Sequence, residues 1–306
     1  MRVKAVSRKS NYPKKGFRLT GNTDLNNRAV YLVPGNRAKG TKTRKMTREE
    51  SVQRAADIMT VSREWSEHGF PVQRATKQEG EWLHQEYIRG PTLRRIYRKK
   101  RATNTQRRDV VRSLAEVVAN MHGLHPPSFA KLPRHVDTMK EIERKAHYFL
   151  QHAMIEGYFT KRQAEKIWAR FVQTRPKKGE YVVTHGDMQP GNILYVRGKP
   201  ELIDLDPQRI FKDLDVARTM HKMNWRSHHR RLFLTEYNRN GGKMTNENDL
   251  PFWDAYLQLQ RIRINDRELD KGASSPYHGF RLAERRTRMI KRLIYWGETG
   301  EGVPTR

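Results

Sequence analysis

The sequence predicts an α+β fold with a small strand-rich part at residues 1–88 and a larger, mainly helical part at residues 89–306. Short apolar runs separated by turn residues occupy the first part, which is typical of antiparallel strands. Apolar residues at three- and four-residue spacing dominate the second part, which is typical of amphipathic helices. The pattern breaks at Arg89, Gly90 and Pro91, so we place the boundary there.

Composition limits the classes of function. The 306 residues include no cysteine, and 62 Lys and Arg against 33 Asp and Glu give a formal net charge of +29. The absence of cysteine excludes disulfides, thiolate metal sites and cysteine nucleophiles. Because neither a secretory signal nor a membrane-spanning apolar run is recognisable, we expect a soluble, cytoplasmic protein. The charge indicates an anionic partner, although it can also serve solubility alone.

In the first part, residues 17–46 predict a meander of short antiparallel strands. From Thr47 the apolar spacing becomes that of a helix, which we expect to end near Gly69. A further strand pair is expected at residues 72–76 and 81–87, around the turn KQEG.

In the second part, Thr92 is expected to cap the first helix. Residues 105–122 predict a strong helix with one apolar face, and residues 136–173 predict one or two more. Two β-prone runs around a loop follow, YVVTHGDMQPGNILYV and KPELIDLD, before a mostly helical region that extends to about Trp296.

One stretch, HGDMQPGNILYVRGKPELIDLD, carries the polar residues that phosphoryl transfer needs. Transfer from a nucleotide requires a carboxylate near the attacking hydroxyl and oxygen ligands that hold Mg²⁺ on the phosphates. Asp187 begins a loop after an apolar strand, Asn192 lies five positions later, and Asp204 ends a second apolar strand. A strand, a loop and a second strand would bring these side chains to the same end of a small hairpin.

The stretch resembles the catalytic loop and the metal-binding segment of the aminoglycoside phosphotransferase and choline kinase-like family, which has the two-lobed fold of protein kinases. The resemblance implies a nucleotide-covering first lobe and a second lobe that is catalytic and binds the acceptor. It implies that Asp187 is the base that orients the acceptor hydroxyl and that Asn192 and Asp204 ligate Mg²⁺. Asp206 would assist a second ion.

Four further positions belong to this comparison. Relatives frequently carry His where Gln189 stands, and Gln cannot titrate near neutrality. Gly186 replaces the arginine that receives an activation-loop phosphate in protein kinases. We therefore expect constitutive activity, which a strong response to phosphatase treatment would contradict. His185 is expected to be a buried residue that organises the loop. Asp215 resembles an acid that anchors the catalytic loop, with a helix N-cap as the alternative.

The resemblance also implies a cation on a strand of the first lobe that contacts the α- and β-phosphates, and an acid on the following helix that holds it. Lys42, Arg44 and Lys45 in TKTRKM compete for the first role, and Glu50 and Asp57 for the second. Exposed surface charge is the alternative for each of them.

The nucleotide base would meet the segment QEYIRGPTL, which resembles the hinge of this family. Backbone groups of Glu86, Tyr87 and Ile88 would contact the adenine of ATP, or the base of GTP. GNTDLNNRAVYLV resembles the hairpin that covers the phosphates, but it lacks the GxGxxG pattern.

Basic clusters lie throughout the second part, at residues 93–101, 106–112, 225–231 and 281–293. Aminoglycosides are polycations, so such a surface indicates a different, anionic acceptor or docking partner. Phosphorylated sugars, lipid headgroups, an anionic membrane surface, nucleic acids and acidic proteins all fit that description. Aromatic residues among the clusters would stack on nucleobases or pack in the core. Amphipathic packing helices are the alternative for the clusters themselves.

The sequence therefore predicts a kinase that uses ATP or GTP and Mg²⁺ to phosphorylate a hydroxyl of a small or headgroup-like anionic acceptor. A protein Ser/Thr kinase of the same fold is one alternative. The other is a non-catalytic polyanion-binding protein on a pseudokinase scaffold.

Overall fold

The computed structural model confirms the predicted α+β class, with small antiparallel sheets and many helices. The structure describes residues 17–18, 30–33, 36–40, 48–80, 82–98, 102–125, 127–132, 138–244, 246–270 and 276–301. The chain forms two compact units. Unit 1 comprises residues 1–133 and 183–208, and unit 2 comprises residues 134–182 and 209–306.

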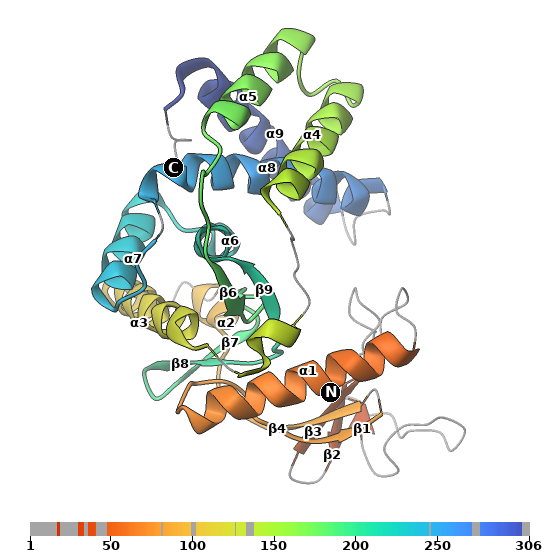
Figure 1. Cartoon of the computed structure of the whole chain (residues 1–306), viewed down its shortest axis with the longest axis vertical. Helices are drawn as coiled ribbons and strands as arrows, with labels where there is room; N and C mark the ends of the chain where they lie inside the picture. The colour runs from red at the N-terminus through yellow and green to blue at the C-terminus, as the bar shows by residue number, and fades with distance from the viewer. Residues whose placement is uncertain are drawn as a thin grey trace. The chain divides into compact units, whose positions relative to one another are not determined.

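Unit 1 begins with a five-stranded sheet of order β1-β2-β3-β5-β4, in which neighbouring strands are antiparallel (Figure 1). Its strands are β1 (Phe17–Arg18), β2 (Val30–Val33), β3 (Asn36–Gly40), β4 (Ala75–Glu79) and β5 (Trp82–Glu86). The predicted antiparallel meander is thus confirmed over the described residues.

The strands of the β4–β5 hairpin begin and end at other residues than predicted. β4 begins at Ala75 and continues through most of KQEG to Glu79, which pairs with Trp82. The reversal falls at Gly80, whose φ of +58° lies in the left-handed region that glycine adopts without steric penalty. The turn is therefore shorter than the run of turn-forming residues suggested.

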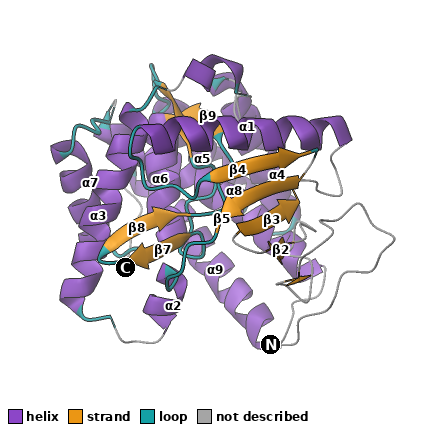
Figure 2. Ribbon diagram, turned by 90° about the horizontal axis from the view of Figure 1, so that it is seen from below, coloured by secondary structure: helices purple, strands orange, loops and turns teal. Residues whose placement is uncertain are grey.

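Helix α1 (Arg48–Glu67) packs on β4 and β5, and both views of unit 1 show it lying across these strands (Figures 1 and 2). Ala55, Ile58, Val61 and Trp65 are buried along its inner face at the spacing that predicted the helix. It ends shortly before Gly69, which has a positive φ of +71°, so the predicted stop is confirmed.

Unit 1 also contains a second hairpin, formed by β7 (Ile193–Val196) and β8 (Lys199–Leu202). Beside it are α2 (Leu93–Arg98), which contacts β7, and α3 (Asn104–Gly123), which contacts β8. The 3₁₀ helix η1 (Pro127–Lys131) follows α3. The predicted apolar face of α3 is buried, and Thr92 Oγ1 accepts a hydrogen bond from the Arg95 N–H at 3.3 Å, which confirms the predicted helix start. β7 pairs with β8, whereas β6 (Tyr181–Thr184) pairs with β9 (Gln208–Phe211).

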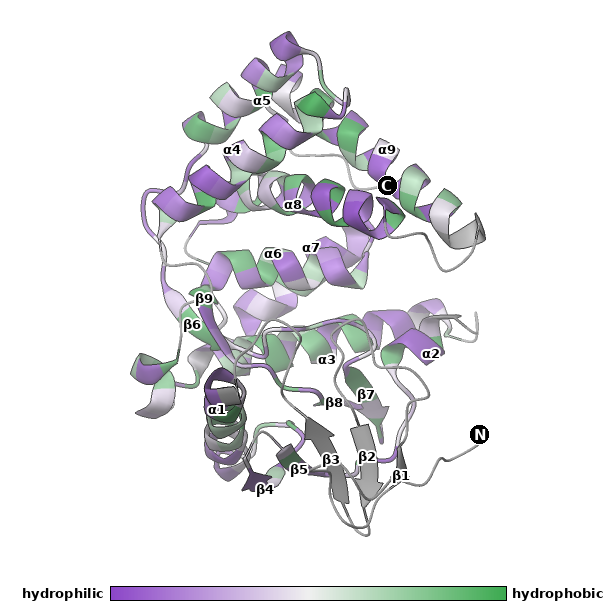
Figure 3. Ribbon diagram, turned by 90° about the vertical axis from the view of Figure 1, so that its right-hand side faces the viewer, coloured by the Kyte–Doolittle hydropathy of each residue, from purple (hydrophilic) through white to green (hydrophobic). Residues whose placement is uncertain are grey.

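Unit 2 is mainly helical, and its helices carry hydrophilic and hydrophobic residues along their length (Figure 3). They are α4 (Met139–Ile155), α5 (Lys161–Gln173), α6 (Lys212–Met223), α7 (Ser227–Arg239), η2 (Glu247–Asp249), α8 (Leu250–Asp270) and α9 (Pro276–Thr299). Aromatic side chains fill the core, where the rings of Phe171 and Phe252 stack at 4.2 Å. The region predicted at residues 136–173 contains two helices, α4 and α5.

The two predicted lobes, residues 1–88 and 89–306, do not coincide with the two compact units. A loop at residues 89–92 separates β5 from α2, as the sequence predicts, but unit 1 includes α2, α3 and the β7–β8 hairpin together with the sheet. The lobe boundary after residue 88 therefore stays a prediction. Among the described residues, no helix has both the length and the apolarity required to cross a bilayer.

Candidate active site

The loop between β6 and β7 is built around the carboxylate of Asp187. Asn192 Nδ2 donates to Asp187 Oδ2 at 2.8 Å and to the Asp187 carbonyl oxygen at 3.1 Å. Gln189 Nε2 donates to the same carboxylate oxygen at 2.7 Å. Both partners of Asn192 Nδ2 are acceptors, so the orientation of this amide is fixed. Its nitrogen faces Asp187, and its Oδ1 therefore points away from Asp187. An amide oxygen of this kind is a type of ligand that Mg²⁺ accepts.

His185 organises this loop from within the core. Its side chain is 0% exposed, and Nε2 lies 2.9 Å from the carbonyl oxygen of Ile203, to which it donates. The other ring nitrogen, Nδ1, accepts from the Asp187 N–H at 3.4 Å. Burial lowers the pKa of His185 and therefore favours this neutral form. The contacts are those of the loop-organising role expected from the sequence.

Gly186 permits a backbone approach that no other residue allows. Its φ is +79°, and a Cβ at this position would lie 1.9 Å from the carbonyl oxygen of Asp206. The Asp206 N–H in turn donates to the His185 carbonyl oxygen at 3.0 Å. Close contact between the loop and the segment after β8 thus explains why glycine replaces the arginine of protein kinases here.

The β7–β8 hairpin brings two predicted magnesium ligands to one end. Ile193 pairs with Leu202, and beyond this pair the Ile203 N–H donates to the carbonyl oxygen of Asn192 at 2.9 Å. Asp204 follows directly, with a left-handed φ of +60°. The sequence predicted this convergence but assigned the wrong first strand to the hairpin. The strand before Asp187 belongs to the β6–β9 pair instead.

The donor set at this end fits Mg²⁺. An amide oxygen from Asn192 and a carboxylate from Asp204 are the hard oxygen ligands that the ion prefers, and phosphate oxygens and water usually complete its octahedron. No group of three or more His, Cys, Asp or Glu residues suited to a metal occurs in the described part of the chain. The set therefore resembles a site shared with a phosphate ligand rather than a cage made by the protein alone.

Asp206, which was expected to assist a second metal ion, forms an ion pair with Arg54. Arg54 Nε, on α1, donates to Asp206 Oδ1 at 2.9 Å, and Arg54 Nη2 donates to Asp206 Oδ2. The side chains are partly buried, 20% and 22% exposed. Both carboxylate oxygens thus accept hydrogen bonds from one guanidinium, an arrangement that opposes the predicted contact with a second metal ion.

Sequence reasoning missed Arg54 because it searched α1 for an acid. Glu50, Arg54 and Asp57 follow one another at four- and three-residue spacing and share a face of the helix. Glu50 is exposed, whereas Asp57 is partly buried, accepts from Gln53 Nε2 at 2.8 Å and has a pKa raised by burial. The position of Arg54 between two candidate acids on one helix face was the feature of the sequence that could have indicated its role.

The cations predicted to meet the phosphates, Lys42, Arg44 and Lys45, lie outside the described residues. β3 ends at Gly40, before all three of them. Within β3, Lys39 pairs with Leu83 of β5, and the sequence analysis did not consider this lysine.

The predicted hinge has fewer open backbone groups than expected. The Glu86 N–H donates to the Arg74 carbonyl oxygen at 2.9 Å, and Gln73 Nε2 donates to the Glu86 carbonyl oxygen at 2.6 Å. A cavity of about 770 Å³ opens beside Tyr87. It is lined by Tyr87, Arg89, Gly90, Pro91, Arg95, Ile96, Ala102, Gln106, Asp109, Val110 and Tyr195.

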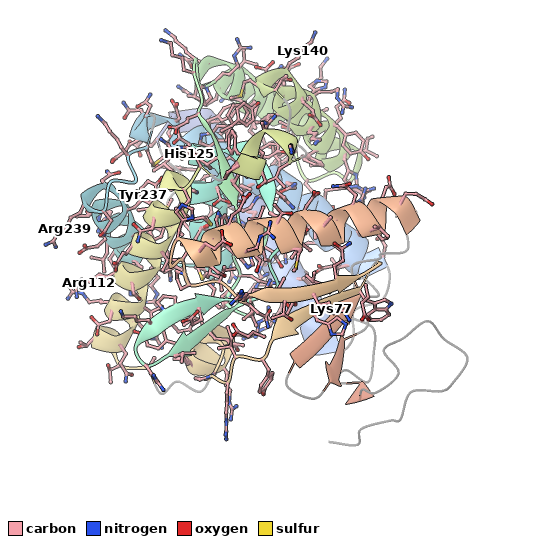
Figure 4. The ribbon with its side chains drawn as sticks, turned by 60° about the horizontal axis from the view of Figure 1, so that its bottom comes forward. Lys77, Arg112, His125, Lys140, Tyr237 and Arg239 are labelled. Carbon is pink, nitrogen blue, oxygen red and sulfur yellow. The ribbon has the colours of Figure 1, made fainter. Side chains whose placement is uncertain are left out.

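Asp215 belongs to unit 2, in the first turn of α6, and is 1% exposed. The N-cap of this helix is Phe211, so the N-cap alternative for Asp215 is wrong. Tyr237, labelled in Figure 4, is fully buried, and burial and the negative charge of Asp215 both raise its pKa. The role of Asp215 in anchoring the catalytic loop stays a prediction.

The profile of the phosphotransferase enzyme family matches residues 22–253. No curated protein matches the chain.

Among solved structures, the choline kinase LicA from Streptococcus pneumoniae is 13% identical, with a TM-score of 0.59 and 91% of this chain and 94% of that chain covered. The macrolide 2′-phosphotransferase MphH from Brachybacterium faecium is 14% identical, with a TM-score of 0.57 and coverage of 89% and 90%. The streptomycin–ATP–APH(2″)-IIa ternary complex is 16% identical, with a TM-score of 0.57 and coverage of 90% and 93%. At these identities the likeness establishes a shared kinase-like fold.

Proposed function

The chain belongs to the phosphotransferase enzyme family, and from this premise we propose that it transfers the γ-phosphoryl group of ATP or GTP to a hydroxyl of an anionic small molecule or headgroup. The observation that carries the proposal is the loop in which the amides of Asn192 and Gln189 both hold Asp187 Oδ2. A carboxylate fixed in this way can receive and orient an acceptor hydroxyl.

Asp187 would act as the base. Its carboxylate would accept a hydrogen bond from the acceptor hydroxyl and take the proton as the new O–P bond forms and the bond to the leaving nucleoside diphosphate breaks. The position of the carboxylate is maintained by Asn192 and by the backbone contacts of His185. Substitution of Asp187 should therefore affect turnover more than binding.

Asn192 and Asp204 would hold Mg²⁺. The ion would supply charge neutralisation on the phosphate oxygens. Support for this assignment comes from the orientation of the Asn192 amide and from the hydrogen bond that joins Asn192 to Ile203, the residue before Asp204. Asp206 is left out of this set because its carboxylate pairs with Arg54.

The nucleotide would lie against unit 1. ATP is present in the APH(2″)-IIa complex, which shares the fold, and supports ATP as the first donor to test. Tyr87 and Ile88 would contact the base, and Lys42 or Lys45 the phosphates, with Glu50 or Asp57 as the partner of that cation. The cytoplasmic location inferred from the sequence stays a prediction.

An anionic acceptor is favoured by the charge of the chain. Cationic side chains such as Lys77, Arg112 and Arg239 project from the surface of their elements (Figure 4), and Arg239 is 79% exposed. Polycations such as aminoglycosides would be repelled by a net charge of +29. We therefore place phosphorylated sugars and anionic headgroups ahead of aminoglycosides as acceptors.

The test is Mg²⁺-dependent transfer from labelled ATP and GTP to a panel of phosphosugars, anionic headgroups, neutral sugars, aminoglycosides and acidic proteins. We expect wild-type transfer to a phosphorylated or otherwise anionic small molecule, and a loss of about 10³-fold or more in kcat for Asp187→Asn. Glu116→Gln, which removes one carboxylate from the exposed face of α3 outside the cavity beside Tyr87, is the control and should retain activity.

Two results would contradict the proposal. Transfer only to Ser or Thr of an acidic protein would instead identify a protein kinase. Absence of turnover with either nucleotide, together with salt-sensitive polyanion binding that survives Asp187→Asn, would identify a binding protein on a kinase scaffold.

A further inference from the structure

Two basic segments that are far apart in the sequence contribute to one group of charges in unit 2. The group, here called the arginine cluster, consists of Arg230 on α7, Arg261 on α8, and Arg285, Arg288 and Arg292 on α9. The three α9 members are spaced by three and four residues, so they share one helix face. α8 packs against α9, and each member acts electrostatically on at least one other member.

A buried ion pair fixes one side of the cluster. Arg230 Nη2 donates to Asp254 Oδ1 at 2.7 Å and to Asp254 Oδ2 at 2.6 Å. The two side chains are 14% and 11% exposed, respectively. Asp254 and Arg261 are seven residues apart on α8, so the same helix face carries both. The same carboxylate also acts on Arg292, whose pKa it raises, so one acid serves two arginines of the cluster.

The remaining arginines repel one another. The pKa of Arg285 is lowered by burial and then by the charges of Arg261 and Arg288. Burial also lowers the pKa of Arg292, and Arg230 lowers it further. Repulsion between these guanidinium groups does not stabilise the fold, and water screens it at Arg285 and Arg288, which are exposed.

Few carboxylates compensate for the cluster. Glu268 acts on Arg285, and Glu284 Oε1 accepts from Arg288 Nη1 at 2.6 Å, but the Arg288–Glu284 pair is 56% and 50% exposed and is thus strongly screened. Among the described residues, Asp254, Glu268 and Glu284 act on the five arginines of the cluster, and Arg281 adds a further positive charge that acts on Arg285.

We propose that the arginine cluster is a binding site for a phosphate-bearing ligand. Guanidinium groups present their N–H donors in a planar fork that matches phosphate oxygens, and a phosphate dianion carries the charge that the cluster leaves uncompensated. In the free protein the guanidinium groups repel one another, and a bound phosphate would attract all of them.

The compactness of the cluster favours a phosphate group over a nucleic-acid strand. Arg285 and Arg292 are only seven residues apart, or about 10 Å at 1.5 Å per residue. Trp225, in the basic segment 225–231, is 8% exposed and packs on Phe233 at 5.2 Å, so its ring is not available to a base, whereas Phe280 and Tyr295 on α9 are exposed. A strand of nucleic acid would need a longer basic track than these arginines provide.

The test measures binding of tripolyphosphate and inorganic phosphate by calorimetry at constant ionic strength. The double variant Arg285→Gln/Arg292→Gln should bind at least about tenfold more weakly than wild type. The control Arg144→Gln/Arg162→Gln removes two exposed arginines from α4 and α5 and should bind as wild type does.

A second readout separates a ligand site from a structural role. Because the charged forms of Arg285 and Arg292 are disfavoured, the ligand-free double variant should unfold at the same temperature as wild type or higher. Vesicles containing phosphatidic acid, with phosphatidylcholine vesicles as the neutral control, distinguish the source of the phosphate. Cluster-dependent binding to the acidic vesicles alone would assign it to a lipid headgroup.

Three outcomes would overturn the inference. They are equal loss of binding in the two double variants, no binding of wild type to any phosphate-bearing probe, and a large drop in unfolding temperature of the cluster variant with unchanged phosphate affinity.

Discussion

Arg54 and Asp206, 152 residues apart in the sequence, form a bidentate ion pair that joins α1 to the segment just after Asp204. The Asp206 N–H is bound at the same time to the carbonyl oxygen of His185. The side chain and backbone of Asp206 thus connect α1, the Asp187 loop and the proposed metal-binding segment. We interpret Arg54 as a positioning residue for that segment.

Arg54→Met and Asp206→Asn should each lower kcat and raise the Mg²⁺ concentration needed for half-maximal activity, while the KM for acceptor changes little. The coupling energy from unfolding of the single and double variants should be about 1–2 kcal/mol, because the pair is partly buried. Arg63→Met is the control, since Arg63 lies 4.0 Å from Glu67 in an exposed pair. Additive losses of stability in the double variant would show that the pair does not act as a unit.

Gln189→Glu should lower kcat by about tenfold or more. Gln189 donates to Asp187 Oδ2 and accepts from Arg94 Nη2 at 2.9 Å. Glu keeps the second contact, but it cannot donate to Asp187 and places a like charge beside it, which raises the pKa of the Asp187 carboxyl. The acid limb of the pH–kcat profile should therefore move to higher pH. Gln189→His, which restores a donor, should recover activity, and an unchanged profile in Gln189→Glu would exclude Gln189 from positioning Asp187.

Gly186→Ala should destabilise the protein by at least about 3 kcal/mol and abolish activity, because the new Cβ would overlap the Asp206 carbonyl oxygen at 1.9 Å in a left-handed backbone. Gly198→Ala separates the cost of the steric overlap from the cost of the left-handed backbone. Gly198 also has a positive φ, +84°, but nothing lies within 4 Å of its Cβ position, so it should lose only about 1 kcal/mol. Denaturant unfolding measures both, and equal losses would refute the steric argument.

Stability should fall on acidification because of His221. Burial lowers its pKa to about 4, with Asp254 raising it and the charges of Arg230, Arg261 and Arg285 lowering it. Below about pH 6.5 the unfolded chain binds a proton that the folded chain does not, so stability falls as the pH decreases, by about 2 kcal/mol at pH 5.

The variant His221→Gln should remove this part of the pH dependence of unfolding, measured from pH 7 to pH 5. His125→Gln replaces an exposed histidine (Figure 4) and should leave the slope unchanged. A slope that is the same in wild type and His221→Gln would show that His221 does not carry the effect.

The predictions that rested on local sequence were largely confirmed. The apolar spacing in residues 105–122 gave the buried face of α3, because a helix repeats its environment every three to four residues whatever its neighbours are. Asp187 and Asn192, predicted to lie together, are hydrogen bonded because the loop that joins them is short, whereas the contact of Gln189 with Asp187 was not predicted.

What the sequence by itself determined was therefore the order of the elements, their inner faces and the proximity of Asp187 and Asn192. The tertiary structure alone decided that Asp206 pairs with Arg54, that β6 pairs with β9, and that arginines from α7, α8 and α9 act on one another. These contacts join residues far apart in the chain, and the choice of partner depends on how whole elements pack, which local periodicity does not encode.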